Sequence, residues 1–178
     1  EKVEDKADPS FLNLFGYTGV GTQALAGKGA AVTHVDASKK SVAQARKNAE
    51  LAGMAERPIR WIVDDASKFV AREVRRDRRY DAILLDPPKF GRGPDGERWQ
   101  LEEHLPDLLA DIRHLLDENS NALFLTVYAV RMSALSIGEL LRQTLADLPG
   151  QVECGELVVR EETRGLMLPT AIFARWSR

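Results

Sequence analysis

Apolar residues occur along this chain in short runs separated by stretches of helical periodicity. Five runs of five or six residues predict buried strands at 11–15, 30–35, 59–63, 80–85 and 122–127. Between them, apolar side chains spaced three and four residues apart predict amphipathic helices. Two later runs, 152–159 and 171–176, have no helical pattern between them and predict a hairpin. Strands alternating with helices indicate a parallel sheet with right-handed crossovers, and the closing hairpin requires one antiparallel strand.

Capping residues set the expected helix boundaries. Ser38 is expected to cap one helix and Gly53 to end it, whereas Ser136 and Glu139 have the spacing of a capping box. Pro106 is tolerated if it lies in the first turn of its helix. The expected buried faces are Val42, Ala45, Ala49 and Ala52; Ala66, Phe69, Val70 and Val74; Leu105, Leu108, Leu109, Ile112, Leu115 and Leu116; and Ile137, Leu140, Leu141 and Leu145.

Composition limits the class of protein without naming a function. At 178 residues, with 44% hydrophobic and 29% charged residues, the chain is expected to form a single globular domain over 1–178. A net charge of −2 provides no general attraction to nucleic acid, and no apolar run is long enough to span a membrane. The single cysteine excludes an internal disulfide and suits the cytoplasm. The polar lead-in over residues 1–10 has two explanations: a fragment lacking an N-terminal segment, or a trimmed or disordered start.

A glycine-rich turn directly follows the first predicted strand. Residues 16–21 read Gly-Tyr-Thr-Gly-Val-Gly and lead into a helix. Glycines allow left-handed backbone angles and close approach of a ligand, and a helix N-terminus presents free N–H groups. Asp36 follows Gly16 by about 20 residues, the usual offset for an acid that binds a ribose. This arrangement predicts an adenosine-containing cofactor at the edge of the sheet.

Three acidic residues fall at the carboxyl ends of successive predicted strands. Asp36 is expected to bind ribose hydroxyls, Asp65 to accept from an adenine amine, and Asp86 to lie near the reacting group. For Asp65 alone, a cap for its own helix is an equal alternative. The turn residues expected at the amino-acid end of the cofactor are Phe15, Gly16, Tyr17, Thr18 and Gly19. The other expected cofactor-binding residues are Ala37, Ser38, Ala66 and Asp86.

The order of these motifs resembles a known enzyme family. Asn13–Gly21, Val35–Ser38, Asp65-Ala66 and the Leu-Asp-Pro-Pro-Lys-Phe segment at 85–90 are similar to class I S-adenosylmethionine-dependent methyltransferases, and more closely to the bacterial large-subunit ribosomal RNA methyltransferases with a DPPKF motif. The resemblance implies an α/β, Rossmann-like sheet of seven strands, mostly parallel with an antiparallel C-terminal strand, and helices on both faces. It also implies S-adenosyl-L-methionine as the cofactor and ribosomal RNA as the partner. Association with a membrane is not expected. NAD binding competes for the loop, but the spacing is G-x-x-G-x-G rather than G-x-G-x-x-G.

The segment 86–90 carries the expected catalytic residues: Asp86, Pro87, Pro88, Lys89 and Phe90. Prolines fix φ and lack an N–H, so the carbonyls around Asp86 and Pro87 can point rigidly into the site and help the Asp86 carboxylate aim an amino group. Phe90 can stack on a base, and Lys89 can meet a phosphate or a carbonyl. Methyl transfer from a sulfonium needs no metal, and the histidines lack metal-ligand spacing. The alternative is a turn that only ends a strand.

Two departures from related patterns bear on the target atom. Lys89 follows Pro-Pro where amino-group methyltransferases usually have an aromatic residue. Relatives that methylate carbon 5 of cytosine carry a nucleophilic cysteine after the fifth strand, whereas this chain has Thr126 and Tyr128 there. Cys154, the single cysteine, lies in a late predicted strand, where a buried apolar role is expected. A nitrogen target or a diverged activity therefore fits better than carbon alkylation.

Residues around the predicted cleft are candidates for substrate binding. Arg92, Tyr128 and Arg131 are expected to flank the cleft and to contact substrate. The glycine-rich stretch 91–96 is expected to be irregular and mobile, with Trp99 as a candidate lid residue. The arginines at 72, 75, 76, 78 and 79 are interpreted as a solvated face rather than as an RNA-binding patch. The preferred function is methyl transfer to an RNA base; the alternatives are a small-molecule or protein substrate, and a non-catalytic cofactor-binding module.

Overall fold

The computed structural model describes residues 9–178. It contains five helices and nine strands within that range: β1 Ser10–Leu14, α1 Val20–Ala26, β2 Ala31–Asp36, α2 Lys39–Leu51, β3 Ile59–Val63, α3 Ala66–Arg75, β4 Ala82–Leu85, β5 Phe90–Arg92, β6 Arg98–Gln100, α4 Leu101–Arg113, β7 Ala122–Val127, α5 Ala134–Thr144, β8 Gln151–Arg160 and β9 Met167–Ser177. Most of the polar lead-in, residues 1–8, lies outside the described residues.

A seven-stranded sheet forms the centre of the domain, in the order β3-β2-β1-β4-β7-β9-β8. The five strands from β3 to β7 are parallel, and β9 runs antiparallel between β7 and β8. The predicted mostly parallel sheet with an antiparallel last strand is confirmed. The chain leaves β1 toward β2 and β3 on one side and returns to β4 on the other, so a topological switch lies between β1 and β4, where ligands bind in such sheets.

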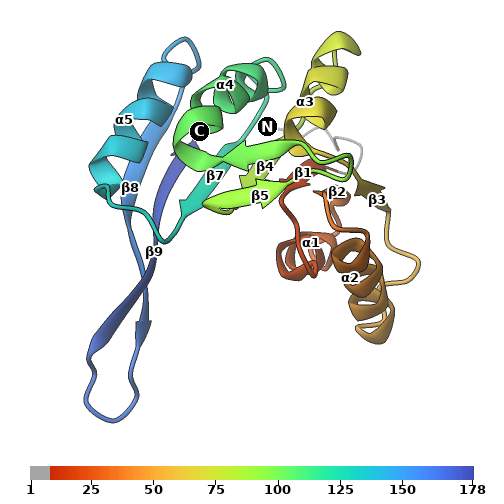
Figure 1. Cartoon of the computed structure of the whole chain (residues 1–178), viewed down its shortest axis with the longest axis horizontal. Helices are drawn as coiled ribbons and strands as arrows, with labels where there is room; N and C mark the ends of the chain where they lie inside the picture. The colour runs from red at the N-terminus through yellow and green to blue at the C-terminus, as the bar shows by residue number, and fades with distance from the viewer. Residues whose placement is uncertain (1–8) are drawn as a thin grey trace, which may run out of the picture.

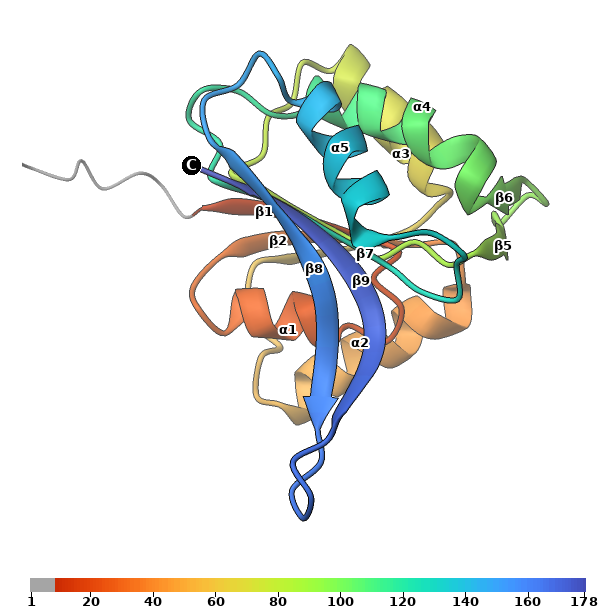
Figure 2. The same cartoon turned by 90° about the vertical axis from the view of Figure 1, so that its left-hand side faces the viewer.

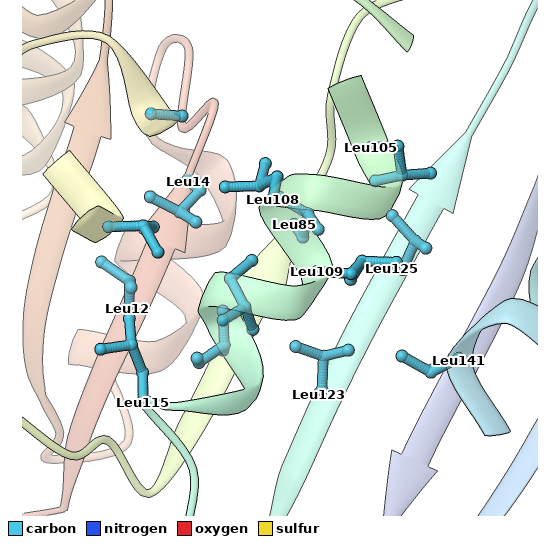
Figure 3. Packing of buried hydrophobic residues seen from close by; sticks show 14 of the residues in the cluster. Leu12, Leu14, Leu85, Leu105, Leu108, Leu109, Leu115, Leu123, Leu125 and Leu141 are labelled. Atoms are coloured by element: carbon cyan, nitrogen blue, oxygen red, sulfur yellow. The ribbon is translucent and has the colours of Figure 1, made fainter. Parts of the chain in front are cut away.

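Helices cover both faces of the sheet (Figures 1 and 2): α1 and α2 lie on one face, and α3, α4 and α5 on the other. The larger core lies beneath α4. Figure 3 shows Leu108 and Leu109 of that helix in one cluster with Leu85 and Leu125 of the sheet. All four side chains are at most 2% exposed, as the leucine stripe of the sequence predicts.

Helix boundaries differ from the expectations at three points. Ser133, rather than Ser136, is the N-cap of α5, and its hydroxyl lies 3.3 Å from that of Ser136. Helix α4 begins at Leu101, so Pro106 lies in the second turn rather than the first. Ala52 is exposed because α2 ends at Leu51, before this position can join the buried face. Ser38 caps α2 as predicted, accepting from the Ser41 N–H at 3.2 Å.

The stretch expected to be irregular is partly a β-hairpin. Phe90–Arg92 pairs with Arg98–Gln100, so Gly91 and Arg92 are in a strand and only the tip is a turn. Lys68 of α3 forms ion pairs with Glu97 and Asp95, and these attach the hairpin to the domain. The prediction missed this hairpin because its strands are three residues each and carry no extended apolar run.

Strands β8 and β9 extend beyond the rest of the sheet as a two-stranded arm (Figure 1). Its outer part exposes Val158, Val159, Leu166, Met167 and Leu168, with exposed fractions of 44–64%. The register shifts between Leu157 and Val158. The predicted hairpin is confirmed and is longer than expected.

Candidate functional site

A cavity of about 290 Å³ opens at the carboxyl ends of the parallel strands. Asp36, Asp65 and Asp86 all contribute to its lining, although they come from the ends of three different strands or the residues that follow them. Its complete lining is Phe15, Tyr17, Val35, Asp36, Ala37, Ser38, Asp64, Asp65, Ala66, Asp86, Pro88, Gly91, Arg92, Gly93, Trp99 and Tyr128. The structure therefore brings together most of the residues selected from the sequence; their individual roles stay predictions.

A second cavity of about 230 Å³ adjoins the first beneath the glycine-rich turn. It is lined by Asn13, Phe15, Gly16, Tyr17, Thr18, Gly19, Val20, Gly21, Leu84 and Asp86. Phe15, Tyr17 and Asp86 line both cavities, so these residues mark the junction between them. The site thus has two compartments, with a carboxylate where they meet.

Asp36 fastens the glycine-rich turn to the end of β2. Its Oδ2 accepts from the Tyr17 backbone N–H at 2.9 Å, and its Oδ1 accepts from the Ser38 N–H at 2.8 Å. Hydrogen bonds to a charged acceptor are stronger than neutral ones, so these two contacts fix both the turn and the carboxylate. Asp36 consequently faces the cavity in one orientation.

The turn contains left-handed residues besides glycine. Phe15 and Tyr17 have φ values of 55° and 46°, and Gly19 has 88°. Non-glycine residues with such angles are uncommon and concentrate at functional sites. Hydrogen bonds from Gly16 N–H to the Val35 carbonyl and from Gly19 N–H to the Gly16 carbonyl, each 3.0 Å, hold the backbone in this shape.

A buried polar network supports the turn from below. Asn13 Nδ2 donates to Thr22 Oγ1 at 2.8 Å, and Thr22 Oγ1 lies 2.8 Å from His34 Nδ1. His34 is fully buried, as its position in a strand predicted, and burial lowers its pKa to about 4, although the Asp36 charge acts in the opposite direction. The imidazole is therefore neutral at pH 7, and its ring occupies the space where a Gly16 side chain would lie.

Asp64 and Asp65, which follow the end of β3, make different interactions. Asp65 is the N-cap of α3 and accepts from the Lys68 N–H at 3.0 Å through Oδ1. Asp64 pairs with Arg72 and also accepts from the Asp65 N–H at 2.9 Å. The capping alternative for Asp65 is correct, and the same residue also lines the cavity. Asp64 lines the cavity as well, although it was not among the predicted site residues; the Asp-Asp doublet after β3 was the available signal in the sequence.

The segment 86–90 turns from β4 into the β5–β6 hairpin. The Pro88 carbonyl accepts from Trp99 Nε1 at 2.7 Å, and the Lys89 carbonyl accepts from the Leu101 N–H at 2.9 Å. These two carbonyls therefore fix the hairpin. Phe90 is 64% exposed, and the Lys89 ammonium lies 5.6 Å from its ring centroid and 3.9 Å from Glu102.

Trp99, a candidate lid residue from the sequence, lies in the core. It is 4% exposed, and its ring centroid lies 4.9 Å from that of Phe15 and 5.7 Å from that of His104. It joins the hairpin to the glycine-rich turn and lines the larger cavity. No local sequence pattern predicted this role, because Trp99 and Phe15 are far apart in the sequence and meet only in the folded domain.

The expected substrate residues occupy different positions. Arg92 and Tyr128 line the larger cavity, whereas Arg131 is exposed and outside both linings. Burial raises the pKa of Tyr128, and the nearby Asp86 charge adds to the effect, so the phenol is protonated at neutral pH. Arg131 lies beyond the end of β7 at Val127, in the loop that leads to α5.

Most of the arginine run over 72–79 is engaged with acids of the domain. Arg72 pairs with Asp64, Arg76 lies 3.0 Å from Glu73, and Arg79 lies 2.8 Å from Asp77. These contacts agree with a solvated, internally paired face. Residues 9–178 contain no cluster of three or more His, Cys, Asp or Glu side chains arranged for a metal ion, and no helix in that range is suited to cross a membrane.

Comparison with known proteins supplies the family. The family model described as Conserved hypothetical protein 95 matches residues 3–95, just over half of the chain. The chain belongs to this family. A ribosomal RNA large subunit methyltransferase K/L from Methylococcus capsulatus is 45% identical over 84 residues, which are 47% of this chain and 11% of that protein. A ribosomal RNA large subunit methyltransferase I from Klebsiella pneumoniae is 38% identical over 85 residues, which are 47% of this chain and 21% of that protein.

Solved structures extend the similarity over the whole domain. A methyltransferase from Agrobacterium tumefaciens, described as S-adenosylmethionine dependent, has a TM-score of 0.93 and 49% identity, covering 98% of this chain and 57% of that chain. A Streptococcus mutans protein with 19% identity, covering 98% of this chain and 46% of that chain, has a TM-score of 0.77 and shows the shared fold. This Conserved hypothetical protein 95 member therefore has a Rossmann-like methyltransferase fold, and it spans only about a tenth to a fifth of the two curated relatives above.

Proposed function

We propose that this domain is an S-adenosylmethionine-dependent methyltransferase that modifies a base of ribosomal RNA. The position of Asp86 carries the proposal: it lies at the junction of the two cavities, beside two aromatic side chains of the strained turn. A carboxylate at that junction can hold a substrate group between the two compartments. The names of the curated relatives support ribosomal RNA as the substrate class.

The side chains of the site suit a donor-rich, positively charged nucleoside. In this proposal Asp36 binds the ribose hydroxyls and Asp65 accepts from an exocyclic amine; both line one compartment together with Ala37, Ser38 and Ala66, which supports these roles. Phe15–Gly19 surround the compartment suited to the amino-acid end. When bound, the cofactor supplies an electrophilic methyl group on a sulfonium.

The chain's own contribution to the reaction is positioning. Asp86 accepts a hydrogen bond from a substrate amino group and so directs its lone pair, which is the nucleophile of an in-line displacement. A carbon–nitrogen bond forms as the carbon–sulfur bond breaks, and the nitrogen then loses a proton to solvent or to Asp86. The exposed Phe90 ring offers a stacking surface for a base, and the Lys89 ammonium lies 5.6 Å from its centroid. Arg92 provides positive charge in the lining of the larger cavity.

A nitrogen is the better target because no thiol faces the site. Methylation of cytosine carbon 5 by the covalent route requires a cysteine adduct. Cys154 lies in β8 opposite Ala174. Its sulfur packs against Gly138 of α5, so closely that a Cβ added to this glycine would lie 2.6 Å from the sulfur. The chain has no other cysteine.

Substitution of Asp86 tests the proposal. The Asp86→Ala variant is expected to lower the rate of tritiated methyl transfer to ribosomal RNA at least tenfold while leaving the affinity for S-adenosylhomocysteine within about twofold, because one positioning group is lost. Asp107→Ala, an exposed acid of α4, is the matched control.

The assay separates this proposal from its alternatives. Full activity of Asp86→Ala contradicts the positioning role. Transfer to free metabolites or to protein but not to RNA favours the alternative substrates, to which the net charge of −2 raises no electrostatic barrier. Cofactor binding without any transfer favours a non-catalytic module. Detection of 5-methylcytidine by nucleoside mass spectrometry contradicts the nitrogen target.

A further inference from the structure

The Asp86 carboxylate has a buried partner that does not line either cavity. Thr126 of β7 donates from Oγ1 to Asp86 Oδ1. The parallel register pairs Leu85 with Leu125, so Asp86 and Thr126 come one position later on neighbouring strands. The contact is thus determined by strand register, although 40 residues separate the two side chains in sequence.

The two oxygens of Asp86 are in unequal environments. Thr126 binds one oxygen, and no other donor among residues 9–178 is hydrogen-bonded to this carboxylate. Asp36 differs, because backbone N–H groups occupy both of its oxygens. Asp86 lines the cavity, so its second oxygen, which accepts no hydrogen bond from residues 9–178, is the one available to a substrate group.

Thr126 is suited to this task by its rigidity and its surroundings. Its side chain is 8% exposed, so water competes little for its hydroxyl. A β-branched residue in a strand has restricted χ1 rotation, so the donor keeps one position. Without that donor, Asp86, which is exposed, can rotate among several rotamers.

We propose that Thr126 is a positioning residue that holds Asp86 so that its second oxygen receives the substrate amino group. The inference rests on the proposed methyltransferase function and adds a residue that acts through Asp86. Since displacement of a reacting group by about 1 Å can cost about a hundredfold in rate, loss of the hydroxyl should appear mainly in kcat.

The test compares Thr126→Val and Thr126→Ser with the wild-type protein. We expect Thr126→Val to lower kcat for methyl transfer to ribosomal RNA by about 10- to 100-fold, with KM for RNA changed less than about threefold. The affinity for S-adenosylhomocysteine, measured by calorimetry, should stay within about twofold. Thr126→Ser restores the donor and should return kcat to within about fivefold of wild type.

Thr33→Val is the matched control. Thr33 is also 8% exposed and also lies in a strand of the sheet, but its hydroxyl interacts with Tyr80 rather than with a residue of the site. This variant should retain the wild-type kcat. A comparable loss of kcat in Thr33→Val, or a parallel loss of cofactor affinity in Thr126→Val, indicates general destabilisation and overturns the positioning role, as does a wild-type kcat in Thr126→Val.

Crystal structures of the wild-type protein and of Thr126→Val complete the test. If the wild-type protein transfers no methyl group to RNA, the proposed function fails. The rotamer of Asp86 in the two crystal structures then decides whether Thr126 holds the carboxylate, independently of activity. A rotated or multiply placed carboxylate in Thr126→Val supports the inference. An unchanged carboxylate overturns it.

Discussion

Gly16→Ala is predicted to damage the proposed cofactor site through a steric clash beneath the glycine-rich turn. A Cβ at this position would lie 2.5 Å from both Cε1 and Nδ1 of His34, and 3.2 Å from Nδ2 of Asn13. The φ of Gly16 is outside the left-handed region, so the alanine backbone is acceptable and only the side chain conflicts. The substitution is therefore a test of packing rather than of backbone strain.

The structure sets the size of the effect. Ordinary van der Waals contact begins near 3.4 Å, so either the turn or the imidazole must move by about 1 Å. His34 is fully buried and interacts with Thr22, so its ring cannot move without disturbing the surrounding packing and this polar contact. Overpacking of this kind costs about 1–3 kcal/mol. For a domain of this size that corresponds to a fall in Tm of roughly 2–12 °C.

Calorimetric binding of S-adenosylhomocysteine provides the functional readout. A displaced turn moves the Tyr17 N–H away from Asp36, so the affinity should fall about tenfold, equivalent to about 1.4 kcal/mol. Gly29→Ala is the matched control, because Gly29 has a φ of 92° but nothing within 4 Å of an added Cβ. That variant should lose stability through backbone strain and keep its affinity.

A double-mutant cycle identifies the clashing partner. Adding His34→Ala to Gly16→Ala removes the ring, so the two substitutions should be strongly non-additive in affinity. Additive effects would show that the imidazole is not the obstacle. A Gly16→Ala protein with the Tm and affinity of the wild type would refute the reasoning altogether.

Two further predictions concern the same region. Asp36→Ala removes the acceptor of two backbone hydrogen bonds, so the affinity for S-adenosylhomocysteine should fall at least tenfold by calorimetry, with Asp36→Asn intermediate; equal affinities would contradict the role of Asp36. Because burial lowers the pKa of His34 to about 4, the unfolded chain binds a proton between pH 4 and 6.5 that the folded protein does not. The free energy of unfolding should therefore rise with pH across this window, by roughly 3 kcal/mol for this group, and urea titrations of His34→Gln should show a shallower rise.

Much of the fold could be predicted from local patterns. The strand Ile59–Val63 and the strand Ala122–Val127 begin and end where the apolar runs do, and Ser38 caps its helix as its position suggested. These features depend on the periodicity of apolar residues and on contacts between residues a few positions apart. Both can be identified directly from the sequence. The convergence of Asp36 and Asp86 on one edge follows from the same logic, since parallel strands share a carboxyl edge.

Tertiary structure alone determined the precision of the site. Three features of the site were not predicted: the β5–β6 hairpin, the contact of Trp99 with Phe15, and the bond from Thr126 to Asp86. The hairpin has strands of only three residues each, and the other two contacts join residues that are far apart in sequence. No periodic pattern encodes such contacts, because they arise from the register between strands and from the packing of side chains around them. The amino-acid sequence by itself specified that Asp36, Asp65 and Asp86 reach the carboxyl edge of the sheet, because parallel strands share that edge. The folded chain decided the contacts there, adding Trp99 to the cavity lining and leaving Arg131 outside it.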